Sequence, residues 1–170
     1  MRRLTMLGIC LVVVAFFTAA TVLASSPGFV SEDATLTSTT FPDLLVSWHE
    51  SGLGTSQVTY TVTANGSADY CCLTNSGHCP KAANKENSAG PVSATGTFNV
   101  PHNGTVKGSL SVPPPPPPSA LSCGTGQTAG VVAVEYTDVV ITDNTTPATD
   151  SNLSGNTYCL SLAAGVSCPF

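Results

Sequence analysis

The feature that most constrains the fold is a run of β-branched residues from Val131 to Thr142, the longest such run after the N-terminus. Within it, Val132, Val134 and Tyr136 alternate with smaller or polar residues, which is the period of a strand with one buried face. Beyond Asp138 the apolar positions change phase. A β-bulge at this point would explain the change, because an extra residue swaps the faces of the strand. We therefore expect this run to be the central strand of a sheet.

Shorter alternating runs on both sides of it predict further strands, with turn residues between them and almost no helical pattern. These runs occupy residues 44–49, 58–63, 68–73, 98–100, 106–112 and 158–162. Residues 74–93 carry no strand pattern, and Cys79 within them suggests a long loop pinned by a disulfide. The pattern predicts an all-β fold, a single antiparallel β-sandwich of immunoglobulin-like size with about seven strands. A closed barrel is the alternative architecture.

Two connections have distinctive sequences. Asn103-Gly104 lies between two apolar runs, so we expect a hairpin that has these residues at its centre and pairs residues 98–100 with 106–108. Pro113–Pro118 must be extended polyproline II, as an interdomain linker, a docking ligand or a stiff crossing between two sheets. We favour the crossing, because a division here would leave a C-terminal piece of about 50 residues, which would be marginally stable alone.

The N-terminus has the pattern of a secretory signal peptide. Arg2 and Arg3 precede an apolar run from Leu7 to Leu23, and Val22-Leu23-Ala24 places small or β-branched residues at the two positions that determine cleavage after Ala24. An uncleaved anchor helix is the alternative. We predict a signal peptide at 1–24, a loose Ser/Thr-rich lead-in at 25–42 and a single β domain at 43–170. The protein is then expected to be secreted into the extracellular space, with no membrane contact after cleavage.

Charge narrows the range of partners. The whole chain carries a formal net charge of −5, and loss of both arginines with the signal leaves three lysines against ten carboxylates, or −7. Such a surface repels nucleic acid and anionic lipid, so nucleic-acid binding is excluded. An unidentified extracellular partner or a polysaccharide is the partner expected.

No motif for catalysis accompanies these features. The chain lacks a Gly-x-Ser-x-Gly sequence and has three histidines, none of them beside a recognisable nucleophile motif. His49, Glu50, His78 and His102 have no metal-ligand spacing, so neither a metal nor another cofactor is predicted. We expect a non-enzymatic protein with a binding or structural role.

The alternative function is a carbohydrate-binding module that uses exposed aromatic rings. The aromatic residues available for such a platform are Trp48, Tyr60, Tyr70, Tyr136 and Tyr158. Large aromatics more often lie in the core, and we favour that interpretation for Trp48 and Tyr60. In a eukaryotic host, four sequons would offer N-glycosylation acceptors at Asn65, Asn103, Asn144 and Asn152.

Several short motifs between residues 44 and 143 resemble a group of small, uncharacterised secreted β-rich proteins, mainly from actinobacteria and some fungi. They are Val46-Ser47-Trp48, Gly52-Leu53-Gly54, Cys79-Pro80-Lys81-Ala82-Ala83-Asn84-Lys85, Gly108-Ser109-Leu110, and Ser122-Cys123 with Gly126-Gln127-Thr128. The Pro-Lys-Ala-Ala-Asn-Lys loop is the most distinctive of them, and its Lys81, Asn84 and Lys85 are candidate ligand contacts. The resemblance implies export and a compact β domain, and brings no known activity.

Six cysteines remain after removal of the signal, which predicts three disulfides in an oxidising compartment. Cys71 and Cys72 are consecutive in a predicted strand, so they leave on opposite faces and need different partners. The resemblance implies a bridge from Cys72 to Cys123. Cys71 would then pair with Cys79 in the long loop. This leaves Cys159 for Cys168.

Mass spectrometry of a digest made without reduction tests this connectivity. We expect peptides that join 71 to 79, 72 to 123 and 159 to 168. A peptide that joins 79 to 123, or 159 to 72, would show that the assignment is wrong.

Overall fold

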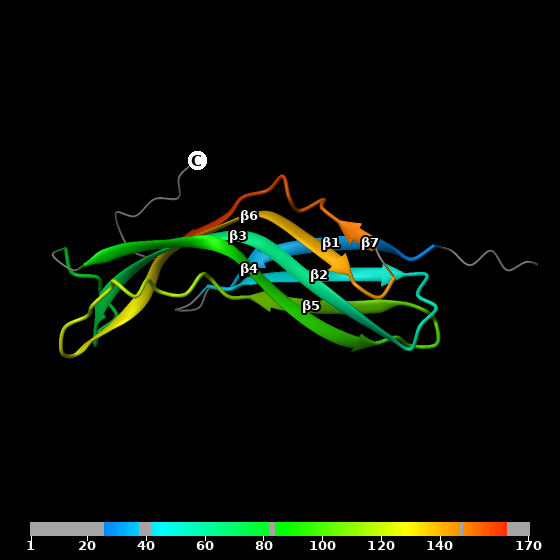
Figure 1. Cartoon of the computed structure of the whole chain (residues 1–170), viewed down its shortest axis with the longest axis horizontal. Coiled ribbons are helices and arrows are strands. Elements are labelled where there is room, and N and C mark those ends of the chain that lie inside the picture. The colour runs from blue at the N-terminus through cyan, green and yellow to red at the C-terminus, as the bar shows by residue number, and fades with distance from the viewer. Residues whose placement is uncertain (1–25, 38–41, 82–83, 147, 163–170) are drawn as a thin grey trace, which may run out of the picture.

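The computed structural model describes residues 26–37, 42–81, 84–146 and 148–162, and these form two antiparallel sheets packed as a sandwich (Figure 1). The strands are β1 (Gly28–Leu36), β2 (Leu44–Ser51), β3 (Gln57–Thr74), β4 (Lys85–Asn99), β5 (Val106–Val112), β6 (Gln127–Asp143), β7 (Ala148–Asp150) and β8 (Tyr158–Ser161). The predicted all-β sandwich is confirmed. In the part of the chain that the structure describes, no helix is long and apolar enough to cross a bilayer.

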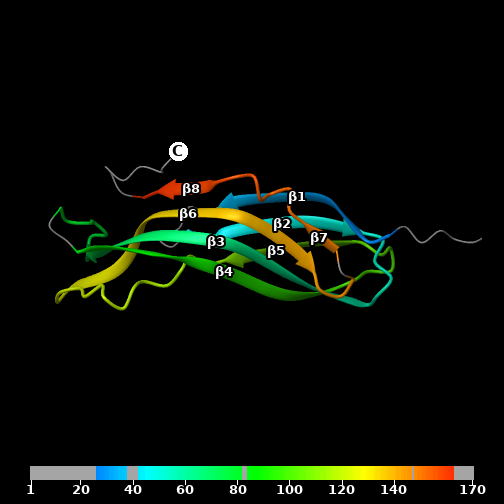
Figure 2. The same cartoon turned by 45° about the horizontal axis from the view of Figure 1, so that its top comes forward.

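The two sheets differ in size. The small sheet has the order β1-β2-β5. The large sheet has the order β4-β3-β6, and β7 and β8 both pair with β6 (Figure 2). Period-2 burial places Leu44, Val46 and Trp48 of β2 against Val58 and Tyr60 of β3 in the interior.

An aromatic cluster fills the middle of the core. The ring of Trp48 lies 4.7 Å from that of Tyr60 and 5.2 Å from that of Phe98, measured between centroids. Gly108 makes room for it, because a Cβ at this position would lie 2.7 Å from the indole ring. Trp48 is 4% exposed, so its predicted place in the core is confirmed.

The central strand β6 contains the expected bulge. Thr63 pairs with Val140 and Asn65 with Thr137, so Asp138 and Val139 together oppose a single residue of β3. Asp138 has a positive φ of 53°, and its carboxylate accepts a hydrogen bond from the Asn65 amide at 2.9 Å. The phase change in the sequence therefore marks a real irregularity.

A second bulge in β6 changes the expected position of one apolar residue, Val132. Asp69 pairs with Ala133 and Tyr70 with Val131, which leaves Val132 as the extra residue. Val131 and Val134 consequently join the core cluster. Val132 is buried as predicted, but it lies outside that cluster and lines a hollow of the large sheet together with Asp69.

Two parts of the predicted strand map are wrong. Residues 28–36 of the expected loose lead-in form β1, whose Phe29 and Ala34 pack against the core. The expected loop at 74–93 is much shorter, because β4 already begins at Lys85. The inward positions of β4 are mostly small residues, which conceals its alternation. Pro91 suits an edge strand, since proline cannot donate to a further ladder.

The predicted hairpin at Asn103-Gly104 is also wrong. Phe98 pairs with β3 and Val106 with β2, so the connection crosses from one sheet to the other. The Gly104 amide donates to the carbonyl of Pro101 at 2.9 Å, which places Gly104 at the last turn position with a φ of 68°. Glycine is favoured at that position of a type I turn, whereas the predicted hairpin needed positive φ at both residues.

The proline segment Pro113–Pro118 crosses between the sheets, as expected, from the end of β5 towards β6. In both views β3, β4 and β6 extend beyond the small sheet at one end, and this segment runs beside the extension (Figures 1 and 2). Pro115 is buried, and its carbonyl accepts the hydroxyl proton of Tyr70. Burial raises the pKa of Tyr70, which keeps the hydroxyl as a donor.

The contact of Gly66 with the proline segment gives a matched test. A Cβ at Gly66 would lie 2.9 Å from Cδ of Pro115, whereas its cross-strand partner Gly90 has no atom within 4 Å. We expect Gly66→Ala to destabilise the domain by roughly 1–3 kcal/mol through overpacking. Gly90→Ala should be neutral or stabilising by up to about 1 kcal/mol. Urea unfolding of both variants measures this, and equal effects would contradict the packing described.

Candidate functional site

The outer face of β3 carries an unbroken row of hydrogen-bonding side chains, which we call the polar track. Its members are Gln57, Thr59, Thr61, Thr63, Asn65, Ser67 and Asp69. Because alternate residues of a strand repeat about every 6.6 Å, the row extends for roughly 40 Å. The inward residues between them are buried, so one strand supplies both core and surface.

Cross-strand hydrogen bonds hold these side chains in place. The hydroxyl of Thr59 lies 2.9 Å from that of Thr97, and that of Thr61 lies 2.9 Å from that of Thr95. The Asn144 amide also donates to Thr61 at 2.8 Å. A hydroxyl accepts more than one hydrogen bond, so these pairs keep acceptor capacity towards a ligand.

The track ends in two adjoining hollows on the same face, of about 140 and 280 Å³. Their lining includes Ser67, Asp69, Lys85, Glu86, Asn87, Val132, Ala133, Glu135 and Cys159. The Asn87 amide donates to Asp69 at 2.8 Å and to Ser67 at 3.1 Å. Strands β3, β4 and β6 thus bring a hydroxyl, an amide, an ammonium group and carboxylates together, and we call this set the polar hollow.

The polar hollow is small compared with an ordinary small-molecule pocket. Small-molecule pockets usually enclose about 300–1,000 Å³, so these depressions suit one group of a larger ligand. The arrangement can donate and accept hydrogen bonds at fixed positions on a rigid sheet.

The loop expected to contact a ligand reaches this site through one residue. Lys85 lines the polar hollow, whereas Lys81 and Asn84 are exposed and are not among its lining residues. The Asn84 amide donates to the Ser122 carbonyl at 3.4 Å. Residues 82 and 83 lie outside the described residues. Sequence reasoning missed Ser67, Asp69, Asn87 and Glu135 as a group, because only strand pairing brings them together.

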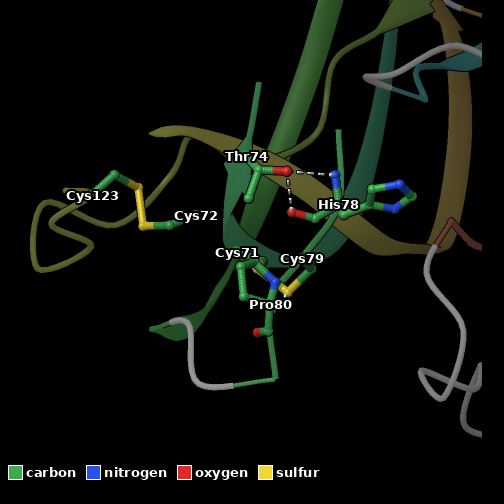
Figure 3. The surroundings of a disulfide bond; sticks show 7 residues. All are labelled: Cys71, Cys72, Thr74, His78, Cys79, Pro80 and Cys123. Carbon is green, nitrogen blue, oxygen red and sulfur yellow. Dashed lines mark hydrogen bonds between the residues drawn. A yellow bond between two sulfur atoms is a disulfide. The ribbon is translucent and has the colours of Figure 1, made fainter. Parts of the chain in front are cut away.

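Two disulfides staple this end of the sheet (Figure 3). Cys71 is bonded to Cys79 and Cys72 to Cys123, which are two of the three expected pairs. A tight loop before Cys79 is closed by Thr74, whose amide donates to the His78 carbonyl at 2.9 Å. The third expected pair, Cys159–Cys168, stays a prediction because Cys168 lies outside the described residues.

The proposed aromatic platform is absent from the described surface. Trp48, Tyr60, Tyr70 and Tyr136 are all at most 4% exposed, and Tyr158 is partly buried against the core. A sugar could not stack on rings placed in this way.

The remaining candidate residues are dispersed. His78 and His102 are exposed, while His49 and Glu50 point to opposite faces of β2. No three His, Cys, Asp or Glu side chains group as a metal site within the described ranges. The sequon residues Asn65, Asn103, Asn144 and Asn152 are all exposed, and their modification stays a prediction.

Comparison with known proteins found no matching family model, curated protein or solved structure. The resemblance described from the short motifs therefore stays a prediction, and the site has to be interpreted from its own chemistry.

Removal of each disulfide should destabilise the domain unequally. The Cys72–Cys123 bridge spans 51 residues and the Cys71–Cys79 bridge 8 residues. Chain-entropy estimates give a loss of about 4 kcal/mol for Cys72→Ala with Cys123→Ala, and about 2.5 kcal/mol for Cys71→Ala with Cys79→Ala. Thermal unfolding of the two double variants shows which bridge contributes more to stability. An equal or larger loss for the short bridge would contradict it.

Proposed function

We propose that this is a secreted, non-enzymatic protein that binds a hydroxyl-rich polysaccharide at the cell exterior through the polar track and the polar hollow. The observation that carries the proposal is the unbroken row of seven outward hydrogen-bonding side chains on β3. A polymer of sugar hydroxyls repeats donors and acceptors along its length, which is the chemistry that such a row complements.

The composition of the track favours a polysaccharide over a protein partner. Protein interfaces depend on buried anchors, most often Trp, Tyr or Arg, seated in pockets. The track has no such anchor, because Trp48 and three tyrosines lie in the core instead. These are Tyr60, Tyr70 and Tyr136. Its side chains are neutral except for Asp69 at its end. A neutral, extended and hydrated ligand fits this surface best.

Export supports the same function. The N-terminal sequence has the pattern of a signal peptide, and disulfides such as Cys72–Cys123 persist in oxidising compartments. Without stacking rings, each contact contributes little, because a net hydrogen bond is worth about 0.5–1.5 kcal/mol. We therefore expect a Kd near 1 mM for a short oligosaccharide, and tighter binding for a polymer that engages the whole row.

Titration followed by two-dimensional NMR tests this function. The probes are soluble neutral β-glucan, xylan and chitin oligomers. We expect one of them to shift the amide signals of Thr61, Asn65, Ser67 and Asp69 while those of the small sheet stay in place. The triple variant Ser67→Ala, Asp69→Ala, Asn87→Ala should weaken binding at least tenfold.

A matched variant removes hydroxyls from the outer face of the small sheet. Ser47 and Ser109 are cross-strand partners there, and Ser47→Ala with Ser109→Ala should leave the affinity unchanged. Absence of binding to all three probes, or binding that the triple variant does not weaken, would overturn the proposal.

A further inference from the structure

Two acidic side chains lie fully buried in the same part of the core. Glu50 comes from β2 of the small sheet and Asp143 from the end of β6 in the large sheet, and both are 0% exposed. Tyr60 lies between these groups, because it is the cross-strand partner of Asp143 and its hydroxyl is close to Glu50. The pair therefore faces across the boundary between the sheets.

The two carboxyl groups have very different surroundings. Asp143 accepts hydrogen bonds from the amides of Thr145 and Thr146, at 2.7 and 3.1 Å, and from the Thr146 hydroxyl. Neither oxygen of Glu50 has a hydrogen-bond partner, and the Tyr60 hydroxyl and the Trp48 indole nitrogen are also buried without one. A buried carboxylate without donors is costly, whereas a protonated carboxyl is far less so.

No cation compensates Glu50 within the described residues. Lys81, Lys85 and Lys107 are exposed, as are His78 and His102, and His49 points to the outer face of β2. The titratable groups that face Glu50 from the packed strands are Tyr60 and Asp143. Burial raises the pKa of Glu50, the nearby Tyr60 hydroxyl, which does not reach hydrogen-bond geometry, acts against this, and the charge of Asp143 adds to the rise.

A second acidic pair joins the same two sheets at their edges. Glu32 of β1 faces Asp150 of β7, and the Asn152 amide donates to the Asp150 carboxylate at 3.0 Å. Partial burial raises the pKa of Glu32, and a hydrogen bond with Asp150 together with its charge adds to the shift. A carboxyl and a carboxylate can share such a bond only when one of them keeps a proton.

We propose that the sheets meet at an acid-strengthened junction, in which Glu50 and Glu32 take up protons where they face Asp143 and Asp150, so that the sandwich is most stable in acidic surroundings. This junction is independent of the polysaccharide site, because the track lies on the opposite face of β3. A protein held at an acidic cell exterior would gain rigidity there and loosen as the pH rises.

The direction in which stability changes with pH follows from proton linkage. A group whose pKa is raised on folding binds more protons in the native state than in the unfolded state. The stabilisation that such a glutamate contributes is fully present below its ordinary pKa, about 4.5, and is lost as the pH rises through its pKa in the folded state. Each such group changes the folding equilibrium constant by up to about tenfold per pH unit in this window.

Urea unfolding of the purified protein between pH 4 and pH 8 tests the junction. We expect the wild-type folding constant to fall with rising pH. Glu50→Gln should abolish most of this fall. At pH 7.5 the folding constant of the variant should be at least tenfold larger than that of the wild type. Glu32→Gln should reduce the fall by a smaller amount, because this side chain is partly exposed.

General repulsion in an acidic chain would also produce a fall, so a charge-matched control is needed. Asp33→Asn removes one charge from an exposed position of β1, next to Glu32, and should leave the slope unchanged. Added 0.5 M NaCl should likewise leave the pH dependence of the wild-type folding constant unchanged, because salt screens exposed charges far more than buried ones. Equal slopes for Glu50→Gln and Asp33→Asn would overturn the proposal.

A direct titration covers the case in which Glu50→Gln does not fold. Carbon-13 NMR of the wild-type carboxyl groups reports the midpoint of each one. We expect the Glu50 midpoint well above the ordinary glutamate value of 4.5. A Glu50 midpoint at that ordinary value would exclude the junction.

Discussion

The constraint on which the structure depends is the length of β3. This strand has 18 residues, whereas those of the small sheet have 9, 8 and 7, so a second sheet can cover only part of its inner face. The remainder would expose Tyr70 and Ala68. The proline segment covers it instead, and the hydroxyl of Tyr70 donates to Pro115. A polyproline strip suits this place because it needs no ladder of its own.

The same constraint accounts for the position of the disulfides. An extension with only a strip of chain over it buries less apolar surface than the sandwich proper, so its ends need other restraint. The two described bridges lie there, one to the loop after β3 and one to the segment that follows the prolines. The polar hollow is built on this stapled extension. A site held on a rigid sheet loses little conformational freedom when a ligand binds.

The sequence was informative where local pattern and tertiary packing agree. The change of phase after Tyr136 predicted the bulge at Asp138, because a strand keeps its faces only if the extra residue is accommodated there. The second bulge at Val132 left no mark, since the residues around it are all apolar. Asn103-Gly104 indicated a turn correctly but could not reveal its class, because both a hairpin and an arch between sheets accept this dipeptide. β4 was missed for a related reason: its inward positions hold small residues, which give no apolar alternation.

The candidate site was likewise visible in the sequence only where a local pattern within one strand was enough to indicate it. Thr59, Thr61 and Thr63 alternate with apolar residues in the sequence, a pattern typical of a strand with a soluble outer face. That the polar row continues through Asn65 to Asp69 depends on β3 passing Gly66 without a turn, and an Asn-Gly pair predicts the opposite. The polar hollow needs the register of three strands, which pairs Asp69 with Asn87 and Ser67 with Glu135. No pattern within any one strand contains that information.

The proposed binding surface and the proposed acid-strengthened junction use different chemical groups. Only 9% of the residues are charged, and apart from Asp69 the outer face of β3 carries hydroxyl and amide groups that do not titrate. The groups that respond to acid lie instead at the meeting of the sheets, where Glu50 has no donor. A change of pH would therefore alter the free energy of unfolding while most of the track keeps its hydrogen-bonding pattern. Asp69 is the one track residue that carries a charge, and it lies at the end of the row, in the polar hollow.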